Sequence, residues 1–269
     1  MKTFKALLSA AFLCPALAGA QTVTTGLGAA AAPQFERLTV GLGAAVFPQF
    51  EGSSDYRVMA APAFSFDFGP VSVRSTGPGF EADLFGSRAF NAGPILRWNG
   101  GRDPADIDNL AVSALPKVDG AVMLGGFAQA NVPLGAGLIL SPRIDVLQGL
   151  DGGHDGLIAE ASVGVTKRME KWTFGGSAGI TYADDAYMDA FFSVAPVSPS
   201  GLAAFTAGSG IKDIGLTAFA SYRYNENWSV TAVAGVKRLM GDAADSPVVS
   251  VAGNENQGFL SLGVSYTFN

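Results

Sequence analysis

The chain has 269 residues, of which 15% are charged, 35 are glycine and one is cysteine. Soluble domains usually carry about 25% charged residues and about 7% glycine, so this composition argues against an ordinary water-exposed surface. The apolar content of 48% excludes disorder, and the net charge of −6 argues against nucleic acid as a partner, because phosphate binding needs clustered Lys and Arg.

Residues 1–20 have the pattern of a secretory signal peptide. Two lysines open the segment, residues 6–16 are apolar, and Ala18-Gly19-Ala20 is a small-residue cleavage site. The apolar run is shorter than the roughly 20 residues that a membrane-spanning helix needs. We expect cleavage to remove the only cysteine, Cys14, and two of the 17 basic residues, which leaves 15 basic against 23 acidic side chains. The exported protein would then have no disulfide, thiol nucleophile or cysteine metal ligand.

Residues 21–35 are rich in Ala, Gly and Thr, and we expect them to be a flexible periplasmic lead-in. From residue 36 onward, apolar side chains recur at every second position, as at Leu260, Leu262 and Val264, with Ser and Gly between them. This alternation is typical of β-strands. The predicted strands are 36–47, 56–68, 70–77, 79–86, 89–98, 120–133, 137–149, 156–168, 171–183, 213–225, 228–239 and 258–268.

The low charge decides between a soluble sheet and a membrane barrel. A soluble β-sandwich would place many Lys and Glu residues on its outer face, whereas here the face opposite the apolar one carries Gly, Ser and Thr. Aromatic residues such as Trp172 and Tyr266 lie near the strand ends, where membrane barrels place their interfacial girdles. Two uncharged windows, Gly120–Pro142 and Ala190–Ile211, contain too much Gly and Pro for a spanning helix.

The sequence therefore predicts an all-β protein, a transmembrane antiparallel up-and-down β-barrel of about 12 strands, over residues 36–269. Short turns such as 134–136 and 225–227 would face the periplasm. The longer connections, roughly 99–119, 184–212 and 240–257, would be external. No second domain is predicted.

Few residues suggest chemistry. His154 could act as a general base near a serine such as Ser162, as in a membrane-embedded hydrolase, but its Gly/Asp surroundings favour a tight turn, and no nucleophile-elbow motif accompanies it. The same turn lacks the closing Glu of a calcium loop. Gly41-Leu42-Gly43 lies within a strand and is not a dinucleotide loop. We therefore predict no catalytic, cofactor-binding or metal-binding residues and no cofactor.

Charged side chains inside the barrel are a further expectation. Arg74, Arg88, Arg97 and Arg102 could line the lumen and pair with carboxylates there, which would either plug the barrel or tune its ion selectivity. The acidic pairs Asp184-Asp185 and Asp242/Asp245 could meet divalent cations at lipopolysaccharide phosphates, but solvated loop charge is the simpler interpretation.

Several segments together resemble the MipA/OmpV family, the MltA-interacting proteins of the outer membrane. The resemblance covers the exported part of the chain in order, and its most specific segment is Arg238-Leu239-Met240-Gly241-Asp242-Ala243-Ala244-Asp245-Ser246-Pro247-Val248-Val249. Other matching segments are 41–43, 48–58, 93–98, 101–103, 152–156, 187–188, 200–202, 210–215 and 256–257. One departure is at the C-terminus, where Asn269 follows Phe268, although barrels of this kind commonly end on an aromatic residue.

The resemblance implies a protein of the cell outer membrane that contacts lipid and lipopolysaccharide. The best-known member is described as a scaffold between a lytic transglycosylase and a murein synthase, and other members are linked to adhesion. No catalytic residues are carried over. The leading hypothesis is a non-enzymatic scaffold with murein-synthesising and murein-hydrolysing partners. The alternatives are a passive pore for small solutes and an outer-membrane hydrolase that depends on His154.

Overall fold

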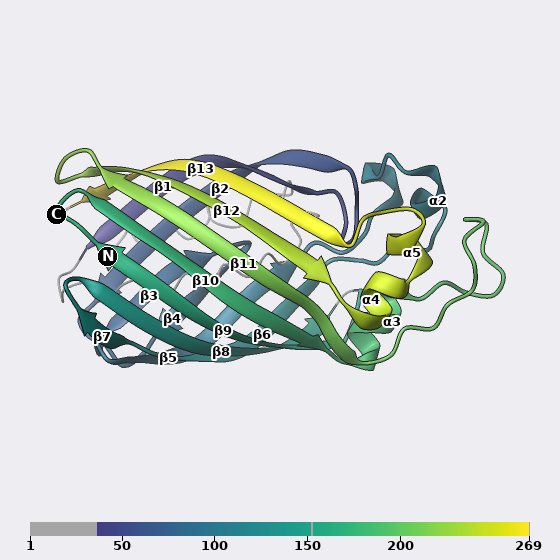
Figure 1. Cartoon of the computed structure of the whole chain (residues 1–269), viewed down its shortest axis with the longest axis horizontal. Coiled ribbons are helices and arrows are strands. Elements are labelled where there is room, and N and C mark those ends of the chain that lie inside the picture. Colours follow the sequence, from purple (N-terminus) through teal and green to yellow (C-terminus); the bar gives the residue numbers. More distant parts are fainter. Residues whose placement is uncertain (1–36, 152, 269) are drawn as a thin grey trace, which may run out of the picture.

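The alternating segments form a single antiparallel sheet (Figure 1). The computed structural model describes residues 37–151 and 153–268, so the expected signal peptide (1–20) and lead-in (21–35) lie outside the described residues. The strands are β1 (Leu38–Pro48), β2 (Tyr56–Phe68), β3 (Val71–Thr76), β4 (Gly79–Asp83), β5 (Phe90–Asn99), β6 (Ala121–Ala130), β7 (Val132–Gly135), β8 (Leu138–Asp151), β9 (Leu157–Arg168), β10 (Trp172–Ala183), β11 (Gly210–Arg223), β12 (Trp228–Leu239) and β13 (Asn256–Phe268).

The sheet closes into a barrel. β1 pairs with β13, which brings together the first and last strands, and β6 pairs with β8. β7 follows β6 after a break at Asn131 and continues along the same neighbour, β8. When β6 and β7 are taken as one interrupted strand, the described part of the chain is a closed barrel of twelve antiparallel strands, as the sequence predicts.

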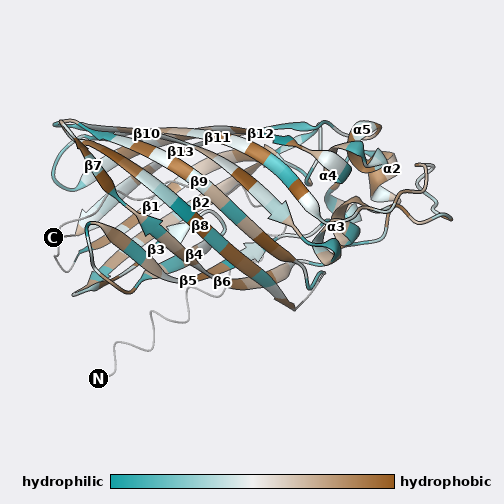
Figure 2. Cartoon of the chain, turned by 60° about the horizontal axis from the view of Figure 1, so that its bottom comes forward, coloured by the Kyte–Doolittle hydropathy of each residue, from teal (hydrophilic) through white to brown (hydrophobic). Residues whose placement is uncertain are grey.

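The two faces of the wall differ as the alternation predicts. On the outer face Leu42 lies opposite Val264 across the β1–β13 seam, and their side chains are 66% and 44% exposed. On the inner face of the same seam Thr39 and Thr267 share a hydrogen bond of 3.0 Å. Figure 2 shows apolar and polar residues alternating along the strands. An outer face of exposed leucine and valine is stable in lipid rather than in water.

Aromatic side chains gather near one end of this outer face. The rings of Trp172 and Tyr222 lie 4.8 Å apart between centroids, and those of Trp228 and Tyr266 lie 5.0 Å apart. Phe268 packs edge-on against Tyr266 at 4.7 Å. Amphipathic aromatic rings favour the boundary between hydrocarbon and water, so this belt marks one membrane interface.

The two ends of the barrel are built differently. At the turn end the strands join through short connections, 69–70, 84–89, 136–137, 169–171 and 224–227. At the loop end the connections 49–55, 100–120, 184–209 and 240–255 are longer, and the short helices gather there (Figure 1). These are η2 (Pro104–Asp106), α2 (Leu110–Ser113), α3 (Asp185–Phe192), α4 (Gly241–Asp245) and α5 (Pro247–Ser250).

Among the details that differ from the sequence-based prediction, two concern the loop end. The external connections contain helices, because Asn109, Asp184 and Ser246 accept hydrogen bonds from the first main-chain N–H groups of α2, α3 and α5. β11 begins at Gly210 rather than at 213, since a bulge allows the strand to continue past a one-residue shift in register. Within the described ranges no helix has the length and apolarity needed to cross a membrane.

Candidate functional site

Folded loops fill the loop end of the barrel. Tyr187, Met188, Phe191 and Phe192 of α3 are each at most 4% exposed. They pack against inward-facing apolar residues near the loop ends of five strands, which are Ile95, Met123, Leu147, Ile158 and Leu239. A second buried cluster joins residues of all four long connections, which are Phe50, Ile107, Val112, Leu115, Val194 and Val248. We call these two clusters and α3 the loop-end plug.

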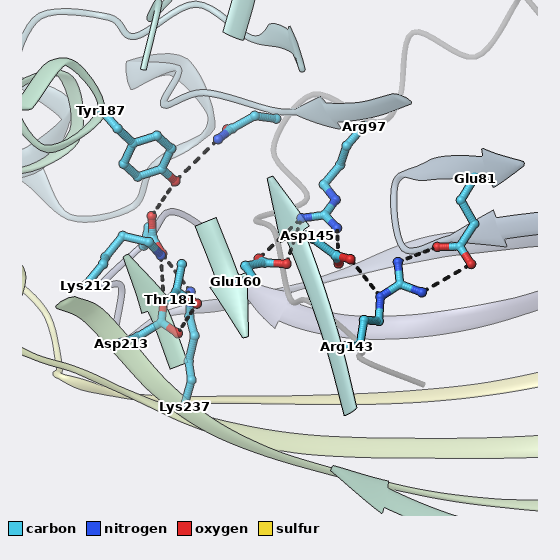
Figure 3. Close-up of polar contacts among 12 residues, drawn as sticks. Glu81, Arg97, Arg143, Asp145, Glu160, Thr181, Tyr187, Lys212, Asp213 and Lys237 are labelled. Carbon is cyan, nitrogen blue, oxygen red and sulfur yellow. Dashed lines mark hydrogen bonds and ion pairs between the residues drawn. The ribbon is translucent and has the colours of Figure 1, made fainter. Parts of the chain in front are cut away.

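Directly beneath the plug, three charged side chains meet around Glu51, which follows β1. Glu51 pairs with Lys212 of β11, and the carboxylate lies 2.6 Å from the Lys237 ammonium of β12. Asp213 lies 2.6 Å from Lys212 and 3.7 Å from Lys237. Tyr187 of the plug donates its hydroxyl to Glu51 at 2.8 Å (Figure 3). Two lysines and two carboxylates balance in charge, so this Glu51 cluster ties the plug to the wall without a net charge.

The bulge in β11 creates half of this cluster. Thr181 of β10 lies opposite Asp213, but the next residue, Tyr182, lies opposite Ile211, so Lys212 is an extra residue in β11. Consecutive residues of a regular strand point to opposite faces, whereas here both Lys212 and Asp213 are buried inside the barrel. The bulge therefore turns an adjacent Lys-Asp pair into a lumen ion pair. A strict period of two would place Lys212 on the outer face, so the alternation alone does not predict this ion pair.

A second set of charges crosses the lumen closer to its middle, and we call it the arginine chain (Figure 3). Arg143 of β8 lies 2.6 Å from Glu81 of β4 and 2.8 Å from its own neighbour on the strand, Asp145. Arg97 of β5 lies 3.8 Å from Asp145 and 3.3 Å from Glu160 of β9. Arg74 of β3 also pairs with Glu81. Three arginines thus face three carboxylates, and most of these side chains are nearly completely buried.

A small cavity of about 50 Å³ lies beside the inner faces of β9–β12, next to the Glu51 cluster. Its lining includes Glu160, Ser162, Ser177, Thr181, Thr217 and Lys237. This volume is enough for a few water molecules and far below the several hundred Å³ of a typical small-molecule site. The cavity is therefore a solvation space beside the charged clusters.

His154 belongs to the plug. Its ring contacts Tyr187 edge-on at 4.9 Å and Phe191 at 5.3 Å, and it is 5% exposed. The Nδ1 atom accepts the N–H of Gly156 at 3.2 Å, while Nε2 is buried without a hydrogen-bond partner among the described residues. Burial lowers the pKa of His154, although nearby Asp184, Glu51 and Asp155 oppose the shift. The described contacts of His154 are therefore those of a neutral packing residue, and Ser162 lines the cavity instead.

Protonation states in the cluster beneath the plug follow from burial and charge. Burial opposes ionisation of Glu51, but Lys212 and Lys237 outweigh it and hold the pKa of Glu51 well below its ordinary value. Burial and the Glu51 carboxylate raise the pKa of Tyr187 far above its ordinary value. Glu51 is therefore a carboxylate acceptor and Tyr187 a neutral donor over the whole physiological range.

The four arginines that the sequence analysis placed in the lumen have different positions. Arg74 and Arg97 lie inside and pair with carboxylates, as predicted. Arg102 lies in the plug, where it donates to the Phe191 carbonyl oxygen at 2.8 Å, and burial lowers its pKa to about 10. Arg88 is exposed in the 84–89 turn at the turn end, so its placement in the lumen is wrong. The predicted strands 79–86 and 89–98 cover most of this turn, whereas β4 ends at Asp83 and β5 begins at Phe90.

The acidic loop residues have structural partners. Asp184 caps α3 by accepting from the N–H of Tyr187 at 2.9 Å. Asp185 and Asp242 accept the main-chain N–H groups of Ser209 and Gly208 at 2.5 and 2.7 Å. No group of three or more metal-ligating side chains occurs among residues 37–151 and 153–268. The aspartates hold the 184–209 connection in place.

Comparisons with known proteins agree with this architecture. A family described as "MltA-interacting protein MipA" matches residues 40–268. The "Putative outer membrane protein YiaT" of Escherichia coli O157:H7 is 28% identical over 169 residues, which is 62% of this chain and 65% of that protein's length.

Solved barrels are similar at low identity. The "CymD monoaromatic hydrocarbon channel" has a TM-score of 0.43 at 11% identity, with 86% of this chain and 88% of that one covered. The Pseudomonas putida toluene transporter TodX has 0.40 at 11%, with 93% and 95% covered. The NalP translocator domain of Neisseria meningitidis has 0.42 at 11%, with 89% and 91% covered. The family match spans nearly all of the described barrel, and the chain belongs to the MipA family of outer-membrane β-barrel proteins.

Proposed function

We propose that this barrel is a non-enzymatic scaffold of the outer membrane, which binds murein-synthesising and murein-hydrolysing enzymes at its periplasmic face. The plugged lumen is the observation that carries the proposal. Apolar packing at the loop end and two neutral sets of ion pairs occupy the path that a solute would take. A barrel filled in this way offers its surfaces, rather than a passage, to other molecules.

The turn end is the surface that we assign to the partners. Outer-membrane barrels place short turns in the periplasm, where murein enzymes act, and long loops outside. The turn end presents exposed apolar side chains, with Met169 58%, Tyr224 68% and Leu134 54% exposed. The family's description names an MltA partner, and this supports the same class of enzyme here. We also assign partner contacts to the lead-in 21–35.

Crosslinking in intact cells tests the scaffold. A lytic transglycosylase and a murein synthase should be captured with the wild-type protein, and the Met169→Ser/Tyr224→Ser variant should capture much less of both. The matched control is Val197→Ser, which changes an apolar residue 94% exposed at the loop end and should leave capture unchanged. Absence of both enzymes from the wild-type capture would refute the proposal.

A passive pore is the second candidate, and the polar inner wall toward the turn end favours it. Two pairs of hydroxyl groups share hydrogen bonds on this wall, Thr39 with Thr267 and Ser221 with Thr231, and such a polar lining is compatible with a water-filled lumen. Planar-bilayer recording separates the two functions, because the scaffold predicts little conductance and a pore predicts large, stable single-channel steps. A hydrolase would lose lipid hydrolysis on His154→Ala, whereas the scaffold proposal expects no hydrolysis in either form.

A further inference from the structure

One hairpin of the barrel is shorter than its neighbours. β2 has 13 residues and pairs with β1 through Tyr56–Phe66, but β3 has six residues and pairs with β2 only through Ser65–Phe68. On the other side, β4 pairs with β5 only as far as Gly79 opposite Arg97. The β3–β4 hairpin therefore ends at the 77–78 turn, while β2 continues toward the loop end.

The main-chain groups of β2 beyond this turn lack a strand partner on one side. The Asp67 N–H donates to the Arg37 carbonyl, toward β1, and the Phe64 N–H donates to Ser75 Oγ, toward β3. These directions alternate along a strand, so the main-chain N–H and C=O positions of Pro62, Ala60 and Val58 also point toward the β3 side. Pro62 has no N–H, which is typical of an edge position. No described strand pairs with β2 there, and we call residues 56–62 the free edge.

The free edge lies within the part of the barrel wall that faces lipid. Val58 is 72% exposed and lies on the outer face between Tyr56 and Phe64. Pro62 lies opposite Leu42 of β1, whose side chain is 66% exposed on the same face. Unpaired strand edges are not stable against hydrocarbon, and they persist at membrane depth only beside a water-filled cavity or a partner. The wall is therefore interrupted between β2 and β5.

The inner face beside the free edge is apolar. Residues 58–63 read Val-Met-Ala-Ala-Pro-Ala, so three successive inward-facing positions carry Met59, Ala61 and Ala63. Ala63 is exposed although it points into the barrel. The apolar surface of the outer wall thus continues around the free edge into the lumen.

We propose that the free edge borders a lateral opening between β2 and β5, through which the acyl chain of an outer-membrane lipid enters the barrel. The continuity of the apolar lining with the lipid-facing wall identifies the occupant as a lipid chain. Arg57, at the loop end of the same edge, places a guanidinium near the level of the lipid head groups, 3.9 Å from the exposed Asp106. This opening would be present whether or not the barrel is a scaffold.

Photolabelling in vesicles tests the opening directly. The full-length exported protein is folded into phosphatidylethanolamine vesicles that contain a lipid with a diazirine on its acyl chain, and adducts are mapped by mass spectrometry. We expect adducts on inward-facing Met59, Ala61 and Ala63 to be several-fold more frequent than on Ser261, which faces inward on the fully paired strand β13. Adducts confined to outward-facing residues such as Leu262 would overturn the proposal.

One substitution, its matched control and a single-cysteine variant make the result specific. Ala61→Trp fills the apolar inner face and should abolish the inward adducts while those on Leu262 remain; Ala220→Trp, on the outward face of β11, should change neither. Ala60→Cys in a Cys14→Ser background gives a single thiol at the free edge. A disulfide between two copies in native membranes, or a crosslink from this thiol to residues 21–35, would show that a protein strand occupies the edge and would overturn the lipid proposal.

Discussion

Glu51→Gln is the substitution that tests the closed lumen most directly. Glu51 is 5% exposed and accepts from two ammonium groups and one phenol. The change therefore removes one of the two carboxylates, Glu51 and Asp213, that both lysines contact. Two lysines would then face one carboxylate. Removing one partner from a buried ion pair costs about 3–5 kcal/mol, and we expect the free energy of unfolding to fall by this amount.

Urea unfolding of the barrel in lipid vesicles, followed by tryptophan fluorescence, measures the effect. The control is Glu226→Gln, which removes the same charge from an exposed turn and should change stability by less than about 0.5 kcal/mol. Glu51→Gln combined with Lys237→Met restores neutrality and should recover part of the loss. A Glu51→Gln protein as stable as the wild type would refute the argument that the cluster holds the plug.

The pH dependence of the same group has a definite sign. Lys212 and Lys237 hold the native pKa of Glu51 below its ordinary value of 4.5, despite the opposing effect of burial. The stabilisation from Glu51 is therefore complete above pH 4.5 and is lost as the pH falls from there toward the lowered native pKa. Glu51→Gln should remove this part of the acid sensitivity, so the two unfolding curves should converge at low pH.

Three further predictions concern the plug and the seam. Phe191→Ala removes a ring that is 4% exposed, so it should lower the free energy of unfolding by about 3–5 kcal/mol and raise single-channel conductance. Val197→Ala, at a side chain that is 94% exposed, is the control and should change neither quantity. Burial lowers the pKa of His154, so wild-type stability should decline as the pH falls below the ordinary value of 6.5, and His154→Phe should abolish this decline in pH-dependent urea titrations. Gly43→Ala would place a methyl group 2.3 Å from a β13 carbonyl oxygen and should destabilise the β1–β13 seam by about 1–3 kcal/mol. Gly210→Ala is the matched control, because no atom of the described residues lies within 4 Å of the added methyl group, and heat-modifiable gel mobility reports closure of the barrel.

Strands and their faces were predictable because they depend on local alternation. The run from Leu260 to Val264 shows one face apolar and the other small without reference to any neighbour, and lipid on one side makes that pattern strict. The predicted twelve strands correspond one for one with the observed ones. The strand ends were predicted less accurately, because bulges such as that at Lys212 interrupt the period without a marked change in composition.

The lumen contacts were predictable only in kind. Paired arginines could be expected inside a barrel, and Arg97 fulfils that expectation, but its partner Glu160 lies 63 residues away on a strand that is not adjacent in the sheet. Such pairs depend on which inward positions reach the same depth, and therefore on the shear of the closed barrel. The plug was missed because α3 is only eight residues long and its apolar side chains resemble a loop of mixed composition.

The separation in sequence between Glu51 and its lysines has a consequence for the order of assembly. Glu51 follows the first strand, whereas Lys212 and Lys237 lie 161 and 186 residues later, on two of the last three strands. During assembly of the barrel, the Glu51 carboxylate therefore has neither lysine partner until β11 and β12 have formed. Contacts of such long range form late and slow the process. A partly inserted intermediate without these ion pairs is less stable than the complete barrel, so formation of the Glu51 cluster favours the final step of assembly.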